Sequence, residues 1–289
     1  MLDSGDLKKL ERFCDFCFIR PEPQAMWQPR LGADAWVADG VFQPDKNVPN
    51  KIESGGWHLS KKLHDSWQMR YQELRFLARP TPFRHLGFFP EQAAHWNWCA
   101  EKIQQFKEKH NRRPRILNLF AYSGLASLHA AAAGAEITHV DASKKAISQA
   151  FENRDICGFQ DAPIRFITDD ANGFVAREIR RQRTYDGIIM DPPKYGRGPK
   201  GETWRIEENL RPLLQQAADL LSGDALFLVL TIYAIRASSL AAYYALAEAL
   251  KDRPGSIEAG ELAIEESALS SLDTRRYVSQ ANFARWAAY

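Results

Sequence analysis

From Arg115 onward, short runs of consecutive hydrophobic residues alternate with longer segments in which hydrophobic residues recur every three or four positions. The short runs are typical of strands buried on both faces, and the longer spacing is typical of amphipathic helices. The predicted order is strand 115–120, helix 123–133, strand 136–140, helix 143–157, strand 163–168, helix 171–183 and strand 185–190. Such alternation predicts a parallel sheet that is covered on both faces.

The pattern continues toward the end of the chain. It predicts a helix near 207–222, a strongly apolar strand at 225–231, a helix near 237–251 and two strand-like runs at 257–266 and 278–288. The predicted fold class is therefore α/β, with a Rossmann-like, doubly wound sheet of seven mostly parallel strands whose last strand is antiparallel.

Local signals mark the ends of two of these helices. Ser123 and Ser143 stand where N-caps are expected, and Gly134 and Gly158 stand where the chain must leave a helix. These residues agree with the hydrophobic period.

The first part of the chain has a different pattern. Residues 20–76 are irregular, rich in Trp and Pro, and contain short alternating runs, which predicts a small β-rich N-terminal domain over 1–80. A Pro-Thr-Pro break and a predicted helix at 91–110 form an expected connecting segment over 81–110. The Rossmann-like domain is expected over 111–289.

Composition narrows the class of protein. The 289 residues are 45% hydrophobic, which is enough for a large core, and the 38 basic and 36 acidic side chains leave a net charge of +2. Attraction for a polyanion must therefore come from local patches. The N-terminus has no apolar stretch behind a basic start, and the longest apolar run, 225–235, is too short for a membrane span, so a cytoplasmic protein is expected.

The four cysteines do not form a disulfide framework. Cys14 and Cys17 have the spacing of half a zinc site, but no second ligand pair follows at a usable distance. We therefore expect these two thiols to be buried in a local hydrophobic face, and we predict no metal site.

A small-residue elbow follows the first strand of the alternating region. Leu117–Gly124 leads from a strand into an Ala-rich helix, and Asp141 ends the next strand, where a carboxylate can reach the two hydroxyls of a ribose. Only Gly124 is present where a pyrophosphate seat needs three glycines. The expected ligand therefore has a ribose without a pyrophosphate, as S-adenosylmethionine does. The predicted contacts from this elbow are Phe120, Ala121, Tyr122, Ser123 and Gly124.

Two further acids follow the strand at 163–168. Ligands of open α/β sheets lie outside the carboxyl ends of the strands, so one of Asp169 and Asp170 could accept the adenine amino group while the other caps the next helix. We assign the adenine contact to Asp170, with Ala171 beside it. Asp141 could itself be only a cap, but Ser143 is better placed to cap and would leave Asp141 free.

The most specific motif is Asp191-Pro192-Pro193-Lys194-Tyr195, directly after a buried strand. Two prolines hold the backbone extended and remove two donors, so the carbonyls beside Asp191 are expected to point outward as acceptors for an exocyclic amino group. The carboxylate can orient a nucleophilic nitrogen or accept its proton, and an aromatic ring supplies a stacking face. A rigid turn leaving the sheet is the alternative. The candidate catalytic residues are Asp191, Pro192, Lys194 and Tyr195, and Asp191 is also a candidate cofactor contact.

On these motifs, residues 115–235 resemble the class I S-adenosylmethionine-dependent methyltransferases. Together with Val140-Asp141-Ala142-Ser143, the elbow and the Asp-Pro-Pro-Lys motif resemble the bacterial 23S rRNA base methyltransferase branch. The resemblance implies S-adenosylmethionine as cofactor, with Ala142 among its contacts. An antiparallel pair at the end of the sheet is typical of this family.

Gly87-Phe88-Phe89-Pro90-Glu91-Gln92 is similar to that branch's Gly-x-Phe-x-Asp-Gln-Arg segment, which in the family closes over the cofactor. The resemblance implies a cofactor contact from Phe88. Glu91 replaces the Asp and Ala93 replaces the Arg, so a salt bridge from that Arg to the cofactor carboxylate is not expected.

Enzymes of this branch that methylate cytosine C5 attack the base with a Cys after the fifth strand. This chain reads Leu230-Thr231-Ile232-Tyr233 there, so transfer to nitrogen is favoured.

Basic residues support an RNA substrate, expected to be rRNA. Lys194, Arg197, Lys200 and Arg205 follow the diproline motif, interleaved with Tyr195 and Trp204, which suits phosphate contacts and base stacking. A second group, Arg177, Arg180, Arg181 and Arg183, is equally explained as a solvated helix face. The alternatives are a methyltransferase of a small molecule or protein, or a catalytically silent module that binds the cofactor or RNA.

Overall fold

The computed structural model describes residues 1–45, 55–60, 63–233, 237–267 and 275–289. These residues form two compact units. The N-terminal unit comprises residues 1–91 and 263–280, and the C-terminal unit comprises residues 92–262 and 281–289. The domain ranges expected from sequence, 1–80, 81–110 and 111–289, are a separate division of the chain and stay a prediction.

The C-terminal unit is built on a seven-stranded sheet in the order β10-β9-β8-β11-β14-β16-β15. The strands are β8 (Arg115–Leu119), β9 (Glu136–Asp141), β10 (Ile164–Thr168), β11 (Gly187–Met190), β14 (Phe227–Ile232), β15 (Ser256–Glu265) and β16 (Tyr277–Ala287). The pairs among β8, β9, β10, β11 and β14 are parallel, and β16 pairs antiparallel with β14. The predicted Rossmann-like α/β class with an antiparallel last strand is confirmed.

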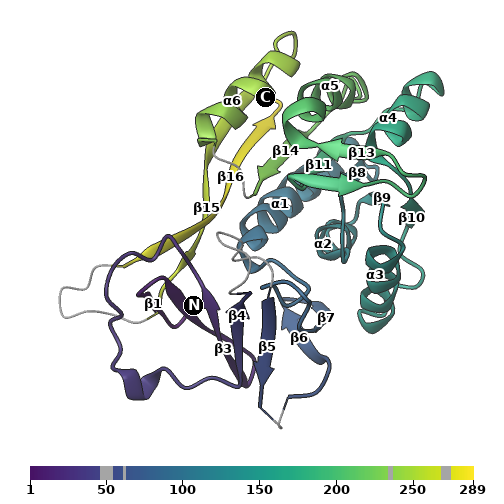
Figure 1. Ribbon diagram of the computed structural model, residues 1–289. Coiled ribbons are helices and arrows are strands. Elements are labelled where there is room, and N and C mark those ends of the chain that lie inside the picture. Colours follow the sequence, from purple (N-terminus) through teal and green to yellow (C-terminus); the bar gives the residue numbers. More distant parts are fainter. Residues whose placement is uncertain (46–54, 61–62, 234–236, 268–274) are drawn as a thin grey trace. The chain divides into compact units, whose positions relative to one another are not determined.

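Helices cover both faces of this sheet (Figure 1). Helices α1 (Ala93–His110), α2 (Leu125–Ala132) and α3 (Lys144–Ile156) pack on one face, and α4 (Ala171–Arg180), α5 (Ile206–Asp219) and α6 (Ser239–Ala249) pack on the other. The central strands are therefore apolar on both sides, and all six residues of β14 are buried. No helix among the described residues is both long and apolar enough to cross a bilayer.

Strand order reverses at β8, which lies between β9 and β11. Leu119 pairs with Val140 on one side and with Met190 on the other, so the residues that follow these strands emerge side by side. This reversal is where open α/β sheets bind their ligands, outside the carboxyl ends of the strands.

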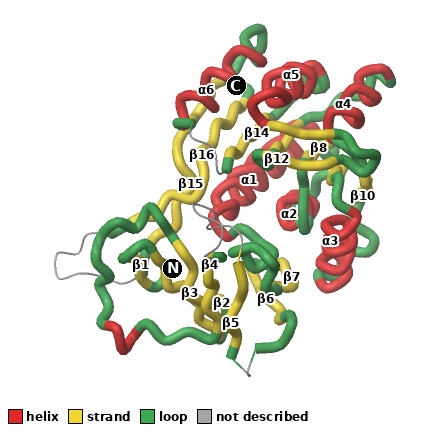
Figure 2. Tube along the Cα trace, in the orientation of Figure 1, coloured by secondary structure: helices red, strands yellow, loops and turns green. Residues whose placement is uncertain are grey.

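The N-terminal unit is β-rich, as predicted, and Figure 2 shows mostly strands and loops in it. A five-stranded sheet contains β1 (Asp3–Gly5), β2 (Lys8–Phe13), β3 (Phe16–Pro21), β4 (Gly40–Pro44) and β5 (Gly55–Leu59). A separate hairpin pairs β6 (Trp67–Tyr71) with β7 (Leu74–Ala78). This part of the chain also contains two short 3-10 helices, η1 (Ala33–Ala35) and η2 (Pro90–Gln92). Aromatic rings fill its core, with Phe18 stacked on Trp67 at 5.3 Å between ring centroids.

Three helix-end predictions are confirmed and one is wrong. The Ser143 side chain caps α3 by accepting the Ala146 N–H at 3.2 Å, and Gly134 and Gly158 follow their helices with left-handed φ values of 99° and 72°. The N-cap of α2, however, is Gly124 and not Ser123, and no side chain caps that helix. The chain enters α2 through the left-handed backbone of Gly124 and not through a capping side chain.

A hairpin that the sequence analysis did not predict follows the diproline motif. It pairs β12 (Tyr195–Arg197) with β13 (Thr203–Arg205). Each strand has only three residues, which is too short for a hydrophobic period to reveal.

Candidate active site

The elbow from Phe120 to Gly124 adopts an unusual backbone conformation. Phe120, Tyr122 and Gly124 have φ values of 56°, 48° and 87°, in the left-handed region where side chains other than glycine are strained. A Cβ atom on Gly124 would also lie 2.9 Å from the Cβ of Ala150, so only glycine lets α2 begin this close to α3. The small residues of the elbow therefore serve packing as well as any ligand.

Hydrogen bonds from neighbouring elements hold the elbow. The Ala121 N–H donates to the Val140 carbonyl at 3.1 Å, and the Asn153 side chain donates to the Ser123 carbonyl at 2.9 Å. A rigid loop of this kind can present its backbone groups to a ligand without paying an ordering entropy on binding.

The Asp141 carboxylate lies at the tip of β9, as predicted, but it is not free. Oδ2 accepts the Tyr122 N–H at 2.9 Å, and Oδ1 accepts the Ser143 N–H at 2.8 Å. The expectation that capping by Ser143 would leave Asp141 without partners is therefore wrong, because the turn itself needs the carboxylate. Each oxygen can still accept a second hydrogen bond. Burial raises the pKa of Asp141, and these two N–H groups oppose that shift.

A buried polar chain lies beneath the elbow. Asn118 of β8 donates to the Ser127 hydroxyl at 2.9 Å, and that hydroxyl lies 3.0 Å from Nδ1 of His139 on β9. Burial lowers the pKa of His139 to about 3, so the ring is neutral at pH 7. This chain links the central strands to α2, and the hydrophobic pattern alone gave no sign of it.

Of the two acids after β10, the one that caps α4 is not the one expected. Asp170 is the N-cap of α4 and accepts the Gly173 N–H at 2.9 Å, whereas Asp169 accepts the Asp170 N–H and forms an ion pair with Arg177. The expectation that Asp169 is the cap is wrong, because Asp170 has the extended backbone that an N-cap requires. Ala171 is buried in the first turn of α4.

Gln92 orders the carboxylate at the tip of β11. Its side-chain amide, which is 8% exposed, donates to Asp191 Oδ2 at 3.0 Å and to the Tyr233 hydroxyl at 3.1 Å. Tyr233 follows β14 and packs against a small cluster of Leu262, Ala281 and Phe283. The sequence analysis quoted Gln92 only within a motif and Tyr233 only for the lack of a Cys, so neither contact with Asp191 was foreseen.

Residues of the β12–β13 hairpin and of α5 donate hydrogen bonds to carbonyls of the diproline motif. The indole N–H of Trp204 donates to the Pro193 carbonyl at 2.6 Å, and the Ile206 N–H donates to the Lys194 carbonyl at 3.0 Å. The prediction of outward, unpaired carbonyls is therefore wrong for Pro193. Trp204 is 3% exposed, with its ring 4.8 Å from that of Phe120, so the prediction that it stacks on a base is also wrong.

Tyr195 is the exposed aromatic residue of this motif. Its side chain is 52% exposed, and its hydroxyl accepts a hydrogen bond from Arg197 at 3.2 Å. Lys194 is also exposed. Pro192, in contrast, is buried where the chain leaves the sheet.

The strand register places the predicted site residues that follow β8, β9, β10 and β11 at one edge of the sheet. Asp191 follows Met190, which pairs with Leu119, the residue before Phe120. Asp141 pairs with Thr168, two residues before Asp170. Phe88 belongs to the N-terminal unit, where its ring contacts Phe13 and Phe76, and its cofactor contact stays a prediction.

The four cysteines differ in their exposure to solvent. Cys99 is buried on α1, and burial raises the pKa of its thiol. Cys157 follows α3 and is half-buried. Cys14 is exposed and Cys17 half-buried, so the expected burial of this pair is wrong for Cys14, which lies at a turn with a φ of 55°.

Comparison with known proteins identifies the family. A crystal structure of a SAM-dependent methyltransferase from Agrobacterium tumefaciens matches with a TM-score of 0.92 and 43% sequence identity, over 100% of this chain and 90% of that chain. The chain belongs to the S-adenosylmethionine-dependent methyltransferases. The resemblance inferred from sequence is confirmed.

Three other matches cover parts of this methyltransferase or show its fold alone. The family model described as conserved hypothetical protein 95 matches residues 92–226. The ribosomal RNA large subunit methyltransferase K/L of Magnetococcus marinus is 34% identical over 156 residues, which are 53% of this chain and 20% of that protein. This chain therefore spans about a fifth of that relative. A proposed methyltransferase from Streptococcus mutans shares the fold, with a TM-score of 0.69 and 13% identity over 99% of this chain and 73% of that chain.

The residues at the strand tips fit the family's cofactor, S-adenosylmethionine. Asp141 offers carboxylate oxygens to the hydroxyls of a ribose, and the elbow offers a rigid backbone at the point where strand order reverses. Asp170 and Ala171 stand at the neighbouring tip, where an adenine would lie beside the ribose. The carboxylates at these tips therefore suit the ribose and the base of a nucleoside.

Proposed function

We propose that this methyltransferase transfers a methyl group to a nitrogen atom of a base in RNA, and that the RNA is ribosomal. The curated relatives named as ribosomal RNA large subunit methyltransferases support this substrate class, as does the basic, aromatic segment after Asp191. An rRNA substrate implies a cytoplasmic location.

One observation carries the proposal: the Asp-Pro-Pro motif emerges directly beside the elbow. Met190 and Leu119 are paired on adjacent parallel strands, so Asp191 and Phe120 leave the sheet next to each other. An acceptor bound at Asp191 would therefore lie beside a cofactor bound at the elbow. Proximity of this kind is the main requirement of a methyl transfer.

The cofactor, when bound, supplies a methyl group on a sulfonium that is already a good leaving group. In our proposal Asp141 accepts hydrogen bonds from the ribose, and Asp170 with Ala171 contacts the adenine. Phe120, Ala121, Tyr122, Ser123, Gly124, Ala142 and Phe88 complete the proposed contacts.

At the acceptor side, the Asp191 carboxylate orients the attacking nitrogen and accepts its proton. The amide of Gln92 holds that carboxylate in place from behind, at 3.0 Å. The Pro192 carbonyl accepts a second hydrogen bond from an exocyclic amino group, exposed Tyr195 stacks on the base, and Lys194 contacts a phosphate.

Transfer to nitrogen is favoured over cytosine C5 because carbon C5 first needs a covalent adduct with a nucleophile. The residues of β14 and its tip, through Tyr233, contain no Cys, and Cys99 is a buried thiol of raised pKa. A thiolate is the reactive form, so Cys99 is unsuited to this role.

RNA from cells that lack this protein tests the proposal. Purified enzyme and radiolabelled S-adenosylmethionine should label that RNA in a base, at a nitrogen atom. Asp191→Asn should lower the rate at saturating cofactor at least about a hundredfold, the usual range for a general base. Asp161→Asn, which changes an exposed carboxylate, is the matched control and should retain full activity.

Two outcomes would contradict the proposal. Label in a protein or metabolite fraction instead of RNA would exclude the RNA substrate. Wild-type rates in Asp191→Asn would exclude the role given to Asp191.

A further inference from the structure

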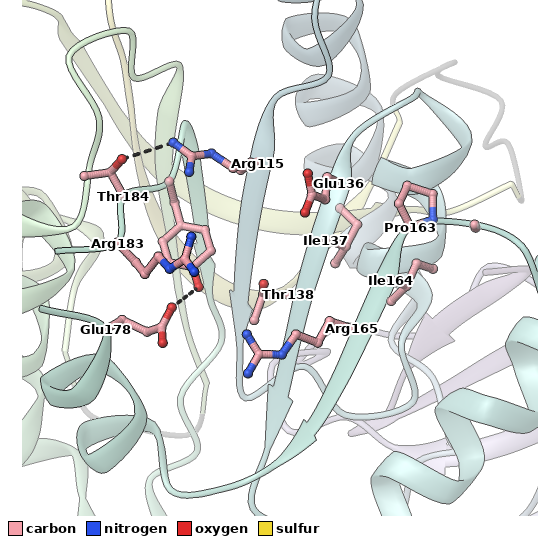
Figure 3. A pocket seen from close by; sticks show the side chains of 12 residues that line it. Arg115, Glu136, Ile137, Thr138, Pro163, Ile164, Arg165, Glu178, Arg183 and Thr184 are labelled. Carbon is pink, nitrogen blue, oxygen red and sulfur yellow. Dashed lines mark hydrogen bonds between the residues drawn. The ribbon is translucent and has the colours of Figure 1, made fainter. Parts of the chain in front are cut away.

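A groove with a volume of about 460 Å³ lies at the opposite end of the central strands from the elbow (Figure 3). Its lining includes the first residues of three parallel strands, Arg115 of β8, Glu136 of β9 and Ile164 of β10. The segment between α4 and β11 closes one side through Arg183 and Tyr185. None of these residues belongs to the site proposed above.

The charges in the groove are unevenly partnered. Glu178 of α4 accepts the Tyr185 hydroxyl at 2.8 Å and forms an ion pair with Arg181 at 3.1 Å, so its charge is compensated. Arg115 donates to the Thr184 hydroxyl at 3.1 Å, which aims its guanidinium without neutralising it.

Arg165 and Arg183 are the two exposed arginines of the lining (Figure 3). Neither guanidinium forms a hydrogen bond or an ion pair with any residue that the structure describes. Three guanidinium groups therefore face one uncompensated carboxylate, that of Glu136, and the groove carries a positive charge.

We propose that this groove binds a backbone phosphate of the RNA substrate, at a distance from the base that is methylated. A guanidinium presents its donors in a planar fork that matches two phosphate oxygens, and two forks with open donors can hold one phosphate from both sides. Thr138 in the lining adds a hydroxyl donor. The proposal rests on the proposed function, because it assigns part of that substrate to the groove.

The spacing fits a polynucleotide better than a single nucleotide. Strand β8 runs from Arg115 in the groove to Leu119 at the elbow, and five residues of a parallel strand span about 16 Å. Such a distance exceeds the reach of one nucleotide, so the phosphate in the groove and the reacting base would belong to different nucleotides of the RNA. Of the group Arg177, Arg180, Arg181 and Arg183, which the sequence left as a solvated face, Arg183 lines this groove.

The test compares RNA affinity in two double variants. Arg165→Ala with Arg183→Ala removes the open guanidinium groups, and Lys109→Ala with Lys251→Ala removes two exposed charges outside the groove. Fluorescence anisotropy with a labelled rRNA fragment, measured from 50 to 300 mM salt, gives the affinity and its salt dependence. Isothermal titration with S-adenosylmethionine checks that each variant is folded.

The groove variant should bind RNA at least about tenfold more weakly at low salt. Its slope of log affinity against log salt should fall by about 0.7 to 0.9, as expected for the loss of one neutralised phosphate. The lysine variant should differ little from the wild type, and both should bind the cofactor normally.

Three results would overturn the proposal in distinguishable ways. If the groove variant bound RNA as tightly as the wild type and still methylated rRNA, the groove would not be a phosphate site, but the proposed function would stand. Binding of inorganic phosphate that depends on both arginines, with unchanged RNA affinity, would show a small-anion site instead. A wild-type protein that neither binds nor methylates RNA would remove both proposals.

Discussion

At Asp191 a buried amide orients the carboxylate to which we assign the acceptor's proton. Gln92 donates to Asp191 and to Tyr233 at 3.0 and 3.1 Å, so it joins the start of α1 to the tips of β11 and β14. An amide cannot exchange a proton with the carboxylate near neutral pH, so it orients Asp191 without competing for the proton of the acceptor. Gln92 is therefore a positioning residue in our proposal.

Gln92→Ala tests this role at the residue scale. We expect kcat to fall about tenfold to a hundredfold, since about 1.4 to 2.7 kcal/mol of orientation in the transition state would be lost. The dissociation constant of S-adenosylmethionine should stay within about twofold of the wild-type value. Single-turnover kinetics and isothermal titration measure the two quantities.

Gln105→Ala is the matched control, since Gln105 is exposed on the same helix and bonds only Glu101 at 3.2 Å. Equal loss of rate in both variants would indicate a defect of the whole helix and would contradict a specific role for Gln92.

At the scale of elements, each candidate side chain stands at the junction of a strand and a helix. Asp170 caps α4, Gly124 begins α2, and Asp141 holds the turn into α3 through the Ser143 N–H. In our proposal the same carboxylates serve both the turn and the ligand. Separating these two uses requires substitutions that keep one of them.

Asp170→Ser and Asp170→Ala separate capping from the proposed adenine contact. Serine is as good an N-cap as aspartate, so Asp170→Ser should keep the stability of the wild type, whereas Asp170→Ala should lose about 0.5 to 2 kcal/mol. Both lack the carboxylate that would accept an adenine amino group, so both should bind S-adenosylmethionine about tenfold more weakly. Urea unfolding and isothermal titration measure the two effects. Normal cofactor affinity in Asp170→Ser would show that Asp170 is only a cap.

At the scale of the whole molecule, folding buries ionisable groups that respond to acid in two separate ranges of pH. In the N-terminal unit, burial alone would raise the pKa of Glu11, but the charges of Arg20 and Lys9 lower it to about 2. In the C-terminal unit, burial lowers the pKa of His95 and of His139 to about 3. As pH falls, the histidines lower the free energy of unfolding before Glu11 does, because their pKa in the unfolded chain is near 6.5.

The free energy of unfolding should therefore fall between pH 7 and pH 5. Below pH 6.5 the unfolded chain binds a proton at each histidine, whereas the folded chain does not until about pH 3. Each buried histidine contributes a loss of about 1.4 kcal/mol per pH unit across that range. Urea unfolding at pH 7.0 and 5.0 measures the difference.

His95→Leu should shrink that difference by about 2 kcal/mol, since the proton uptake at one site is removed. Both ring nitrogens of His95 lack hydrogen-bond partners, so the substitution breaks none. His58→Leu, at an exposed histidine, should leave the pH dependence unchanged. If both variants kept the wild-type difference, burial of His95 would not be its cause.

The hydrophobic pattern predicted most of the C-terminal unit because strands buried on both faces and amphipathic helices leave long, regular signals. The predicted strand at 115–120 is found as Arg115–Leu119, and the predicted helix at 143–157 as Lys144–Ile156. Motif chemistry likewise indicated the cofactor, since a carboxylate after a strand is a local feature of the sequence.

The tertiary structure decided which partners the side chains have. Whether Asp169 or Asp170 caps α4 depends on one pair of dihedral angles, and the burial of Trp204 depends on a hairpin of three-residue strands. The contact between Gln92 and Asp191 joins residues 99 positions apart in the chain. Local sequence determines an element through its own period and caps, but a contact between distant elements exists only after the sheet has brought their ends together.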